Sequence, residues 1–148
     1  GVIIPNSIKN IGSSAFENCK RLISVTIPDS ITSIKVSTFE GCSSLTDITI
    51  PNLVTSIGQS AFNGCSSLKN IIIPSSVNNI GLEVFLGCYN LTSIVVDSKN
   101  EIYDSRENCN AIIETNSNTL IYGCQSTIIP NSVKEEVPIL KVLLSLIP

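Results

Sequence analysis

Apolar and polar positions alternate along most of this chain in a pattern that returns every 23 residues. Five kinds of residue keep this step through four successive units. They are Pro5, Pro28, Pro51 and Pro74; Ile11, Ile34, Ile57 and Ile80; Phe16, Phe39, Phe62 and Phe85; Cys19, Cys42, Cys65 and Cys88; and Leu22, Leu45, Leu68 and Leu91. A constant step in five independent columns predicts a solenoid, in which every coil supplies the same inward side chains to its neighbours.

Each unit has the approximate form L-x-x-I-x-I-P-x-S-V-x-x-I-G-x-x-A-F-x-G-C-x-x. The part L-x-x-I-x-I alternates and is rich in β-branched residues, so it predicts a short strand, which the proline ends because it has no N–H to donate. The part S-V-x-x-I-G predicts a second short extended segment. The part S-A-F-x-G-C predicts a single helical turn, with a serine cap at its start and a glycine at its end.

The stretch SLTDITIPNLVTSIGQSAFNGC, residues 44–65, resembles the BspA-like leucine-rich repeat family. The resemblance covers residues 1–97 closely and resumes at residues 127–133. It implies an α/β leucine-rich repeat solenoid with short parallel strands and brief helical or 3-10 turns in each coil. It also implies a bacterial surface or secreted protein (the family occurs in some protist parasites too) that adheres to a host or matrix ligand, and it brings no catalytic residues.

The period fails between Asp97 and Ile129, where NAIIETNSNTLIYGC shows two β-prone runs around TNSN. These runs predict a β-hairpin over residues 111–123. We expect a single domain, residues 1–148. Regular coils would occupy residues 1–97, an irregular coil containing the hairpin residues 98–129, and a final partial repeat with a C-terminal cap residues 130–148.

The C-terminal tail, KEEVPILKVLLSLIP, departs from the repeat altogether. Its apolar run after Pro138 is consistent with a short helix that starts at a tolerated proline. Because a solenoid needs its open end covered, a cap is the first interpretation of the tail. A homodimer contact through the tail or a solenoid end is the second.

Charged residues are few, and the formal net charge is −3. No basic run or basic–aromatic patch occurs, so nucleic acid is not an expected partner. The longest apolar run is too short to span a bilayer. The chain begins at Gly1 and contains no Met, so we expect it to be part of a longer protein with any signal or anchor upstream. Its expected place is extracellular or at the cell surface.

The chain also contains no His, which removes Ser-His-Asp and Cys-His catalysis and every His-containing metal site. Asp97, Glu101, Asp104 and Glu107 cluster before the hairpin but lack the spacing of a calcium loop, so a solvated loop is favoured. No cofactor, no metal and no enzymatic activity are therefore expected.

Four of the six cysteines lie in the repeating column and are expected to point inward as buried free thiols. Side chains in adjacent coils lie about 4.8 Å apart, whereas the Cβ atoms of a disulfide lie about 3.8 Å apart. Cys109 and Cys124 flank the predicted hairpin. A disulfide between them and two further buried thiols are both compatible with that placement.

If Leu22, Val25 and Ile27 point inward, their neighbours in each strand point outward. The outward positions predict a small, mostly uncharged face that becomes more apolar toward the later coils. Its members are Thr26, Asp47, Thr49, Asn70, Ile72, Ser93 and Val95. The alternative is a β-branched face that reflects strand propensity alone.

Two functions are consistent with these patterns. The first is a cell-surface or secreted module that recognises an extracellular protein through the outward face. The second is a structural spacer that holds other domains away from the cell. The outward face has no aromatic residues, which argues against a carbohydrate platform.

Overall fold

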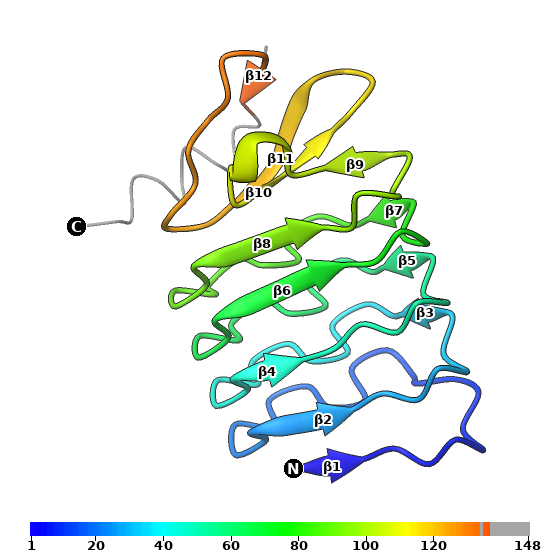
Figure 1. The fold of residues 1–148 in the computed structure, drawn as a ribbon. Helices are drawn as coiled ribbons and strands as arrows, with labels where there is room; N and C mark the ends of the chain where they lie inside the picture. Colours follow the sequence, from blue (N-terminus) through cyan, green and yellow to red (C-terminus); the bar gives the residue numbers. More distant parts are fainter. Residues whose placement is uncertain (134, 137–148) are drawn as a thin grey trace.

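The protein is described by a computed structural model of residues 1–133, 135 and 136. The chain winds into a stack of coils whose first coil is at the base of Figure 1 and whose hairpin is at the top. Two rows of short strands run up the stack. The front row is β1 (Val2–Ile3), β2 (Ser24–Thr26), β4 (Asp47–Ile48), β6 (Asn70–Ile73) and β8 (Ser93–Val96), and the rear row is β3 (Ser33–Ile34), β5 (Ser56–Ile57) and β7 (Asn79–Ile80).

Paired strands in both rows are parallel, and the pairs keep the 23-residue step of the sequence. Val25 lies opposite Ile48, and Ile71 lies opposite Ile94. The rear row is one sheet in the order β3-β5-β7, whereas the front row divides into β1-β2-β4 and β6-β8. The predicted solenoid with short parallel strands is therefore confirmed.

The predicted helical turn in each coil is wrong. Each S-A-F-x-G-C segment forms successive tight turns, with Ser60 at φ 55° and Gly64 at φ 72°. Amides along the segment alternate between two partners: Phe39 donates to the carbonyl of Ala61 in the next coil at 2.9 Å, and Glu40 donates locally to Ser37 at 3.1 Å. A helical turn would direct these amides within its own coil, so the demand for bonds between coils decides the geometry.

Helical structure is correspondingly scarce. In the described part of the chain it amounts to one 3-10 helix, Arg106–Asn108, which belongs to the segment before the hairpin. The molecule is therefore a β-solenoid, and the α/β part of the predicted fold class is only partly borne out.

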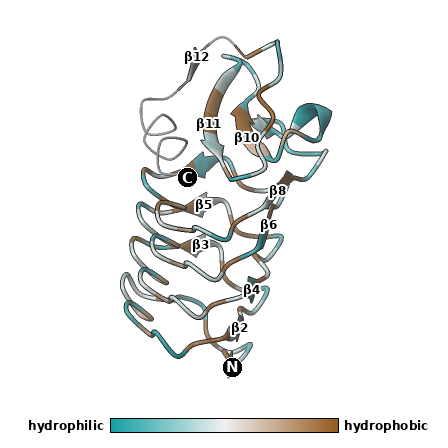
Figure 2. Ribbon diagram, turned by 90° about the vertical axis from the view of Figure 1, so that its left-hand side faces the viewer, coloured by the Kyte–Doolittle hydropathy of each residue, from teal (hydrophilic) through white to brown (hydrophobic). Residues whose placement is uncertain are grey.

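The core consists of the repeating columns. Phe16, Phe39, Phe62 and Phe85 stack with ring centroids 5.4, 5.6 and 5.8 Å apart and nearly parallel planes. Leu45, Leu68 and Ile57 are completely buried. Figure 2 shows the stack from the side, with the front strands along the right-hand edge. The repeated side chains thus form continuous internal ladders, as the sequence predicts.

The predicted hairpin is confirmed as β10 (Ala111–Glu114) and β11 (Thr119–Gly123), which are antiparallel. It lies in a sheet of order β12-β11-β10-β9, completed by β9 (Tyr103–Asp104) and β12 (Glu135–Glu136). Tyr122 of β11 lies edge-on to Phe85, with ring centroids 5.5 Å apart. The hairpin therefore covers the top of the phenylalanine stack. The cap and dimer contact predicted for the C-terminal tail lie outside the described residues.

Candidate functional site

The front strands present the face that the sequence singles out. Val25, Ile48 and Ile71 point inward and are buried. The outward residues of the predicted surface are exposed, except for Ser93, which is half-buried; they are Thr26, Asp47, Thr49, Asn70, Ile72 and Val95. The predicted orientation is thus confirmed, and the structure brings these side chains onto one surface, which we call the front face.

The apolar part of the front face lies on β6 and β8. Ile72 lies directly opposite Val95 in the parallel register. Ile72 is 62% exposed and Val95 is 44% exposed. Two large β-branched side chains are thus held side by side toward solvent on a hydrogen-bonded backbone. The lower members of the same column, Thr49 and Thr26, are smaller and polar, so the face becomes more apolar toward the later coils.

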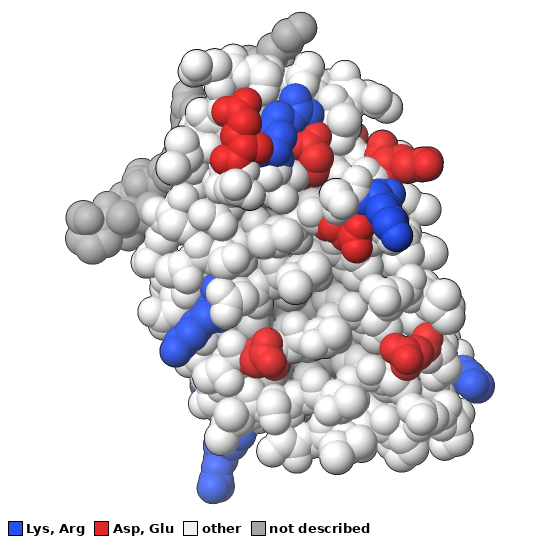
Figure 3. Space-filling model, viewed as in Figure 1, with Lys and Arg blue, Asp and Glu red and all other residues white. Residues whose placement is uncertain are grey.

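Charged side chains are isolated over the front face. Figure 3 shows scattered acidic and basic groups over the coils and a denser mixed cluster at the top, beside the hairpin. A face of this kind can be covered by a partner with little desolvation of charge. Its polar groups are mainly short amides, hydroxyls and single carboxylates.

A shallow groove of about 270 Å³ opens on the front face where β4 meets β6. Four of the predicted surface residues line it, namely Asp47, Thr49, Asn70 and Ile72. The remaining lining residues are Ile48, Ile50, Asn52, Pro74 and Asp97. The groove coincides with the division of the front row, because β4 and β6 belong to different sheets.

Sequence reasoning missed Asn52, Pro74 and Asp97 as members of this site. Asp97 occupies the proline column, 23 residues after Pro74, and a departure from a repeat at that position was a usable signal. Unlike a proline, Asp97 has an amide, which donates to the carbonyl of Ile73 at 2.9 Å. The same substitution brings a carboxylate to the groove.

The segment after Asp97 is tied to the coil below it. Asn100, which is 23 residues after Val77, donates its side-chain amide to the carbonyls of Pro74 at 2.9 Å and Val77 at 2.8 Å. Its side-chain oxygen accepts from the amides of Ile102 and Tyr103. One polar side chain thus replaces a buried valine and carries four hydrogen bonds.

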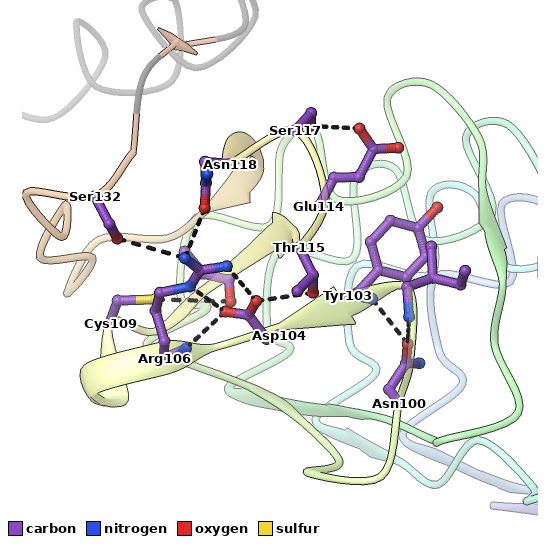
Figure 4. A network of polar contacts seen from close by, with 12 residues as sticks. Asn100, Tyr103, Asp104, Arg106, Cys109, Glu114, Thr115, Ser117, Asn118 and Ser132 are labelled. Atoms are coloured by element: carbon purple, nitrogen blue, oxygen red, sulfur yellow. Dashed lines mark hydrogen bonds and ion pairs between the residues drawn. The ribbon is translucent and has the colours of Figure 1, made fainter.

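The acidic segment before the hairpin is organised around Arg106 (Figure 4). The guanidinium donates to both oxygens of Asp104, at 2.8 and 2.6 Å, and to the side chain of Asn118 at 2.8 Å. Burial by itself raises the pKa of the Asp104 carboxyl, but hydrogen bonds from Arg106 and Thr115 outweigh it and lower the pKa overall. The carboxylate of Asp104 is therefore already bound by side chains of the protein itself.

In the described part of the chain, no three acidic or cysteine side chains converge in a way that could hold a metal ion. Nor does that part contain a helix with the length and apolar character needed to cross a membrane.

The repeating cysteines are free thiols. Cys42, Cys65 and Cys88 are buried and donate to the carbonyls of Phe16, Phe39 and Phe62, at 3.1, 3.2 and 3.1 Å. Burial raises the pKa of Cys42 to about 11 and that of Cys88 to about 12. A raised thiol pKa suppresses the reactive thiolate, so these groups behave as small apolar side chains with one hydrogen bond each.

The other three cysteines differ from one another in burial. Cys19, in the first coil that the structure describes, is exposed, so the prediction that it is buried is wrong. For Cys109 and Cys124 the sequence allows either a disulfide or two thiols, and in the structure both are free thiols. Cys109 is buried and Cys124 half-buried, with its thiol donating to the carbonyl of Asn110 at 3.3 Å.

Known structures resemble this stack. A leucine-rich repeat protein from Bacteroides ovatus is 37% identical over 62% of this chain and 30% of its own length, with a TM-score of 0.55. One from Bacteroides capillosus is 31% identical over 66% of this chain and 76% of its own, with a TM-score of 0.59. The pneumococcal vaccine antigen PcpA shares the fold, with a TM-score of 0.60 at 20% identity over 92% of this chain and 50% of its own.

The leucine-rich repeat protein of T. pallidum is similar over 62% of this chain and 56% of its own length. The chain thus spans between 30% and 56% of the length of three of these four proteins. No curated protein sequence matches it. The repeat family described as "BspA type Leucine rich repeat region" matches residues 1–113 in six copies. The chain therefore belongs to the BspA type leucine-rich repeat family.

Proposed function

We propose that the chain is a surface-exposed or secreted module that binds an extracellular protein through the front face. The observation that carries this proposal is the pair Ile72 and Val95, which are exposed although they stand opposite each other on hydrogen-bonded strands. Removing adjacent apolar side chains from water is favourable in free energy. Because the backbone that carries them is already ordered, association has no additional cost of folding. Family membership supports a location outside the cell.

A structural spacer is the second candidate. The observation that favours it is the uninterrupted core, in which the phenylalanine and cysteine ladders continue through successive coils without a hinge. A rigid stack of this kind keeps its two ends at a fixed distance from each other. Under this proposal the front face is β-branched because strands favour such residues, and no partner covers it.

Surface plasmon resonance with immobilised extracellular-matrix and plasma proteins separates the two. Saturable binding that is lost in the double variant Ile72→Glu, Val95→Glu supports recognition by the front face. The matched control is Leu82→Glu, because Leu82 is 63% exposed and lies in the turn after β7, away from the front strands. Binding that both variants keep would contradict this surface as the site.

Absence of binding to every protein in the panel, by a protein whose circular dichroism and unfolding transition are normal, favours the spacer. A second experiment then measures the distance between labels attached at the two ends of the stack. A spacer predicts a narrow distance distribution that added matrix proteins do not change.

A further inference from the structure

The groove between β4 and β6 exists because the ladder of the front row stops there. β6 and β8 pair over four residues each, from Asn70↔Ser93 to Ile73↔Val96. β4 ends at Ile48, and Thr49 and Ile50 continue without a strand partner. The surface is hollowed at the level of these two residues, and both line the groove.

The proline column leaves an acceptor without a donor at this place. One coil higher, the amide of Asp97 donates to the carbonyl of Ile73 at 2.9 Å. The equivalent residue facing the carbonyl of Ile50 is Pro74, which has no N–H. Within the described chain no backbone amide donates to the Ile50 carbonyl, and both Ile50 and Pro74 line the groove.

Two carboxylates add to this surplus of acceptors. Asp47 of β4 and Asp97 line the groove, and no basic residue does. The ion pair of the described residues is Arg106 with Asp104, so neither groove carboxylate is neutralised by a salt bridge. Asp97 accepts one hydrogen bond, from the amide of Lys99 at 2.8 Å, which leaves lone pairs free on its second oxygen.

The remaining walls suit the stem of a long side chain. Ile48, Ile72 and Pro74 are apolar, and Asn52 and Asn70 add side-chain amides to the lining. A cationic side chain needs such a combination, because its methylene stem packs on apolar surface while its charged end seeks acceptors.

We propose that this groove receives a basic side chain, arginine in preference to lysine. The side chain belongs to an extended segment of the partner protein that binds the front face. Arginine is favoured because its planar fork can reach a carboxylate with two donors and a carbonyl with a third. This inference rests on the proposed function, and it specifies the chemistry of one side chain of the partner at the front face.

The test uses capped five-residue peptides with a central variable residue between valines, titrated to millimolar concentration into ¹⁵N-labelled protein at low salt. The central residue is arginine, lysine or the uncharged isostere citrulline. We expect the arginine peptide to shift the backbone amides of Thr49, Asn70 and Ile72 and the side-chain amide of Asn52. The lysine peptide should bind more weakly, and the citrulline peptide should give no saturable shift.

The decisive variant is Asp47→Asn with Asp97→Asn. Asparagine keeps the side-chain oxygen that accepts from Lys99, so the local turn is retained while both charges are removed. Binding of the arginine peptide should weaken about tenfold, since each exposed ion pair contributes modestly. The matched control is Asp29→Asn, an exposed carboxylate after Pro28 that does not line the groove and that should leave binding within about twofold.

Three results would overturn the inference: equal binding of the citrulline peptide, no saturable shift with any peptide, or equal weakening by the control variant. The proposed function fails separately. If a matrix protein binds and Ile72→Glu abolishes that binding while the double asparagine variant does not affect it, the front face is the site and the groove is not an arginine pocket. If the arginine peptide binds as expected and no protein in the panel does, recognition by the front face is the claim that fails.

Discussion

Tyr122 stands edge-on to Phe85, with ring centroids 5.5 Å apart and planes at 86°. Its hydroxyl donates to the carbonyl of Gly81 at 2.6 Å and accepts from the amide of Val84 at 3.1 Å. One coil lower the equivalent amide, that of Ala61, donates directly to Gly58 at 3.2 Å. The tyrosine hydroxyl is therefore inserted into the turn hydrogen bond of the last regular coil, and this insertion anchors the hairpin to the stack.

Removal of that hydroxyl should loosen the hairpin. We expect Tyr122→Phe to lower the free energy of unfolding by about 1 kcal/mol, the net value of a typical hydrogen bond, because the amide and carbonyl can then bond directly as in the lower coils. Tyr122→Ala should cost about 3–5 kcal/mol, since it also uncovers the ring of Phe85 and leaves a cavity. Urea unfolding followed by circular dichroism measures both.

Tyr89→Phe is the control for this series, because Tyr89 is 59% exposed. Its loss of a hydroxyl should change stability by less than about 0.5 kcal/mol. If the two phenylalanine variants were equally stable, the inserted hydroxyl would have no structural role.

The strands and the outward face were predictable because the period encodes them directly. A column that returns every 23 residues fixes which residues lie above one another, and the alternation in β6 fixes that Ile71 points in and Ile72 out. The hairpin followed from two β-prone runs around a polar turn. Neither result required knowledge of the spacing between coils.

The turns could not be predicted in the same way. The local pattern S-A-F-x-G-C suits one helical turn as well as two tight turns, and the choice depends on amides that bond to the next coil. The groove depends on a ladder that stops between β4 and β6, although both strands match the same consensus. Residues outside the repeat, such as Tyr122 and Asn100, act through neighbours far away in sequence, and no periodic signal marks them.

Two glycines of one column should differ in their tolerance of a side chain. A Cβ added to Gly58 would lie 2.6 Å from the amide nitrogen of Val36 and 2.7 Å from the carbonyl carbon of Lys35 in the coil below. We expect Gly58→Ala to cost about 1–3 kcal/mol, because a backbone contact of this kind is relieved only if the coils move apart. Thermal unfolding measures the effect.

Gly12 occupies the same column in the first coil, and a Cβ there meets nothing within 4 Å. Gly12→Ala should therefore be neutral or raise stability by up to about 1 kcal/mol through a less flexible unfolded chain. Equal effects at the two glycines would show that backbone entropy, and not the approach of neighbouring coils, sets the cost.

The thiol column should make stability fall in alkali. The pKa of Cys42 is about 11 and that of Cys88 about 12 in the folded protein, against an ordinary value of 9.0. The folded state holds these protons more tightly, so this contribution is fully present below about pH 9 and is lost as the pH rises through the folded pKa values. Urea unfolding between pH 8 and about pH 11 should show the loss, and Cys42→Ala should reduce its steepness.

Other groups titrate in the same range, so the comparison with Cys19→Ala is the control. Cys19 is exposed, so its removal should change the alkaline slope less than removal of the buried Cys42 does. The same difference should appear in labelling: a thiol reagent at pH 8 should modify Cys19 in the folded protein and reach Cys42 and Cys88 only after unfolding. Identical slopes in the two variants would contradict the role of burial.

Arg106 should hold the strained segment before the hairpin. Glu107, Asn108 and Asn110 have φ values of 58°, 52° and 51°, a left-handed conformation that costs free energy in residues other than glycine. The side chains of Arg106 and Asp104 are 27% and 26% exposed, so their two-donor contact stabilises locally by about 1 kcal/mol at most. Arg106→Lys keeps the charge and loses the paired geometry.

In Arg106→Lys we expect amide hydrogen exchange in residues 106–110 to accelerate about fivefold, with the exchange of buried Ile71 and Ile94 unchanged. Arg21→Lys, an exposed arginine in the first coil, should change neither set. If exchange in residues 106–110 were the same in Arg106→Lys as in the unmodified protein, the strain would be held by the hairpin backbone and not by the ion pair.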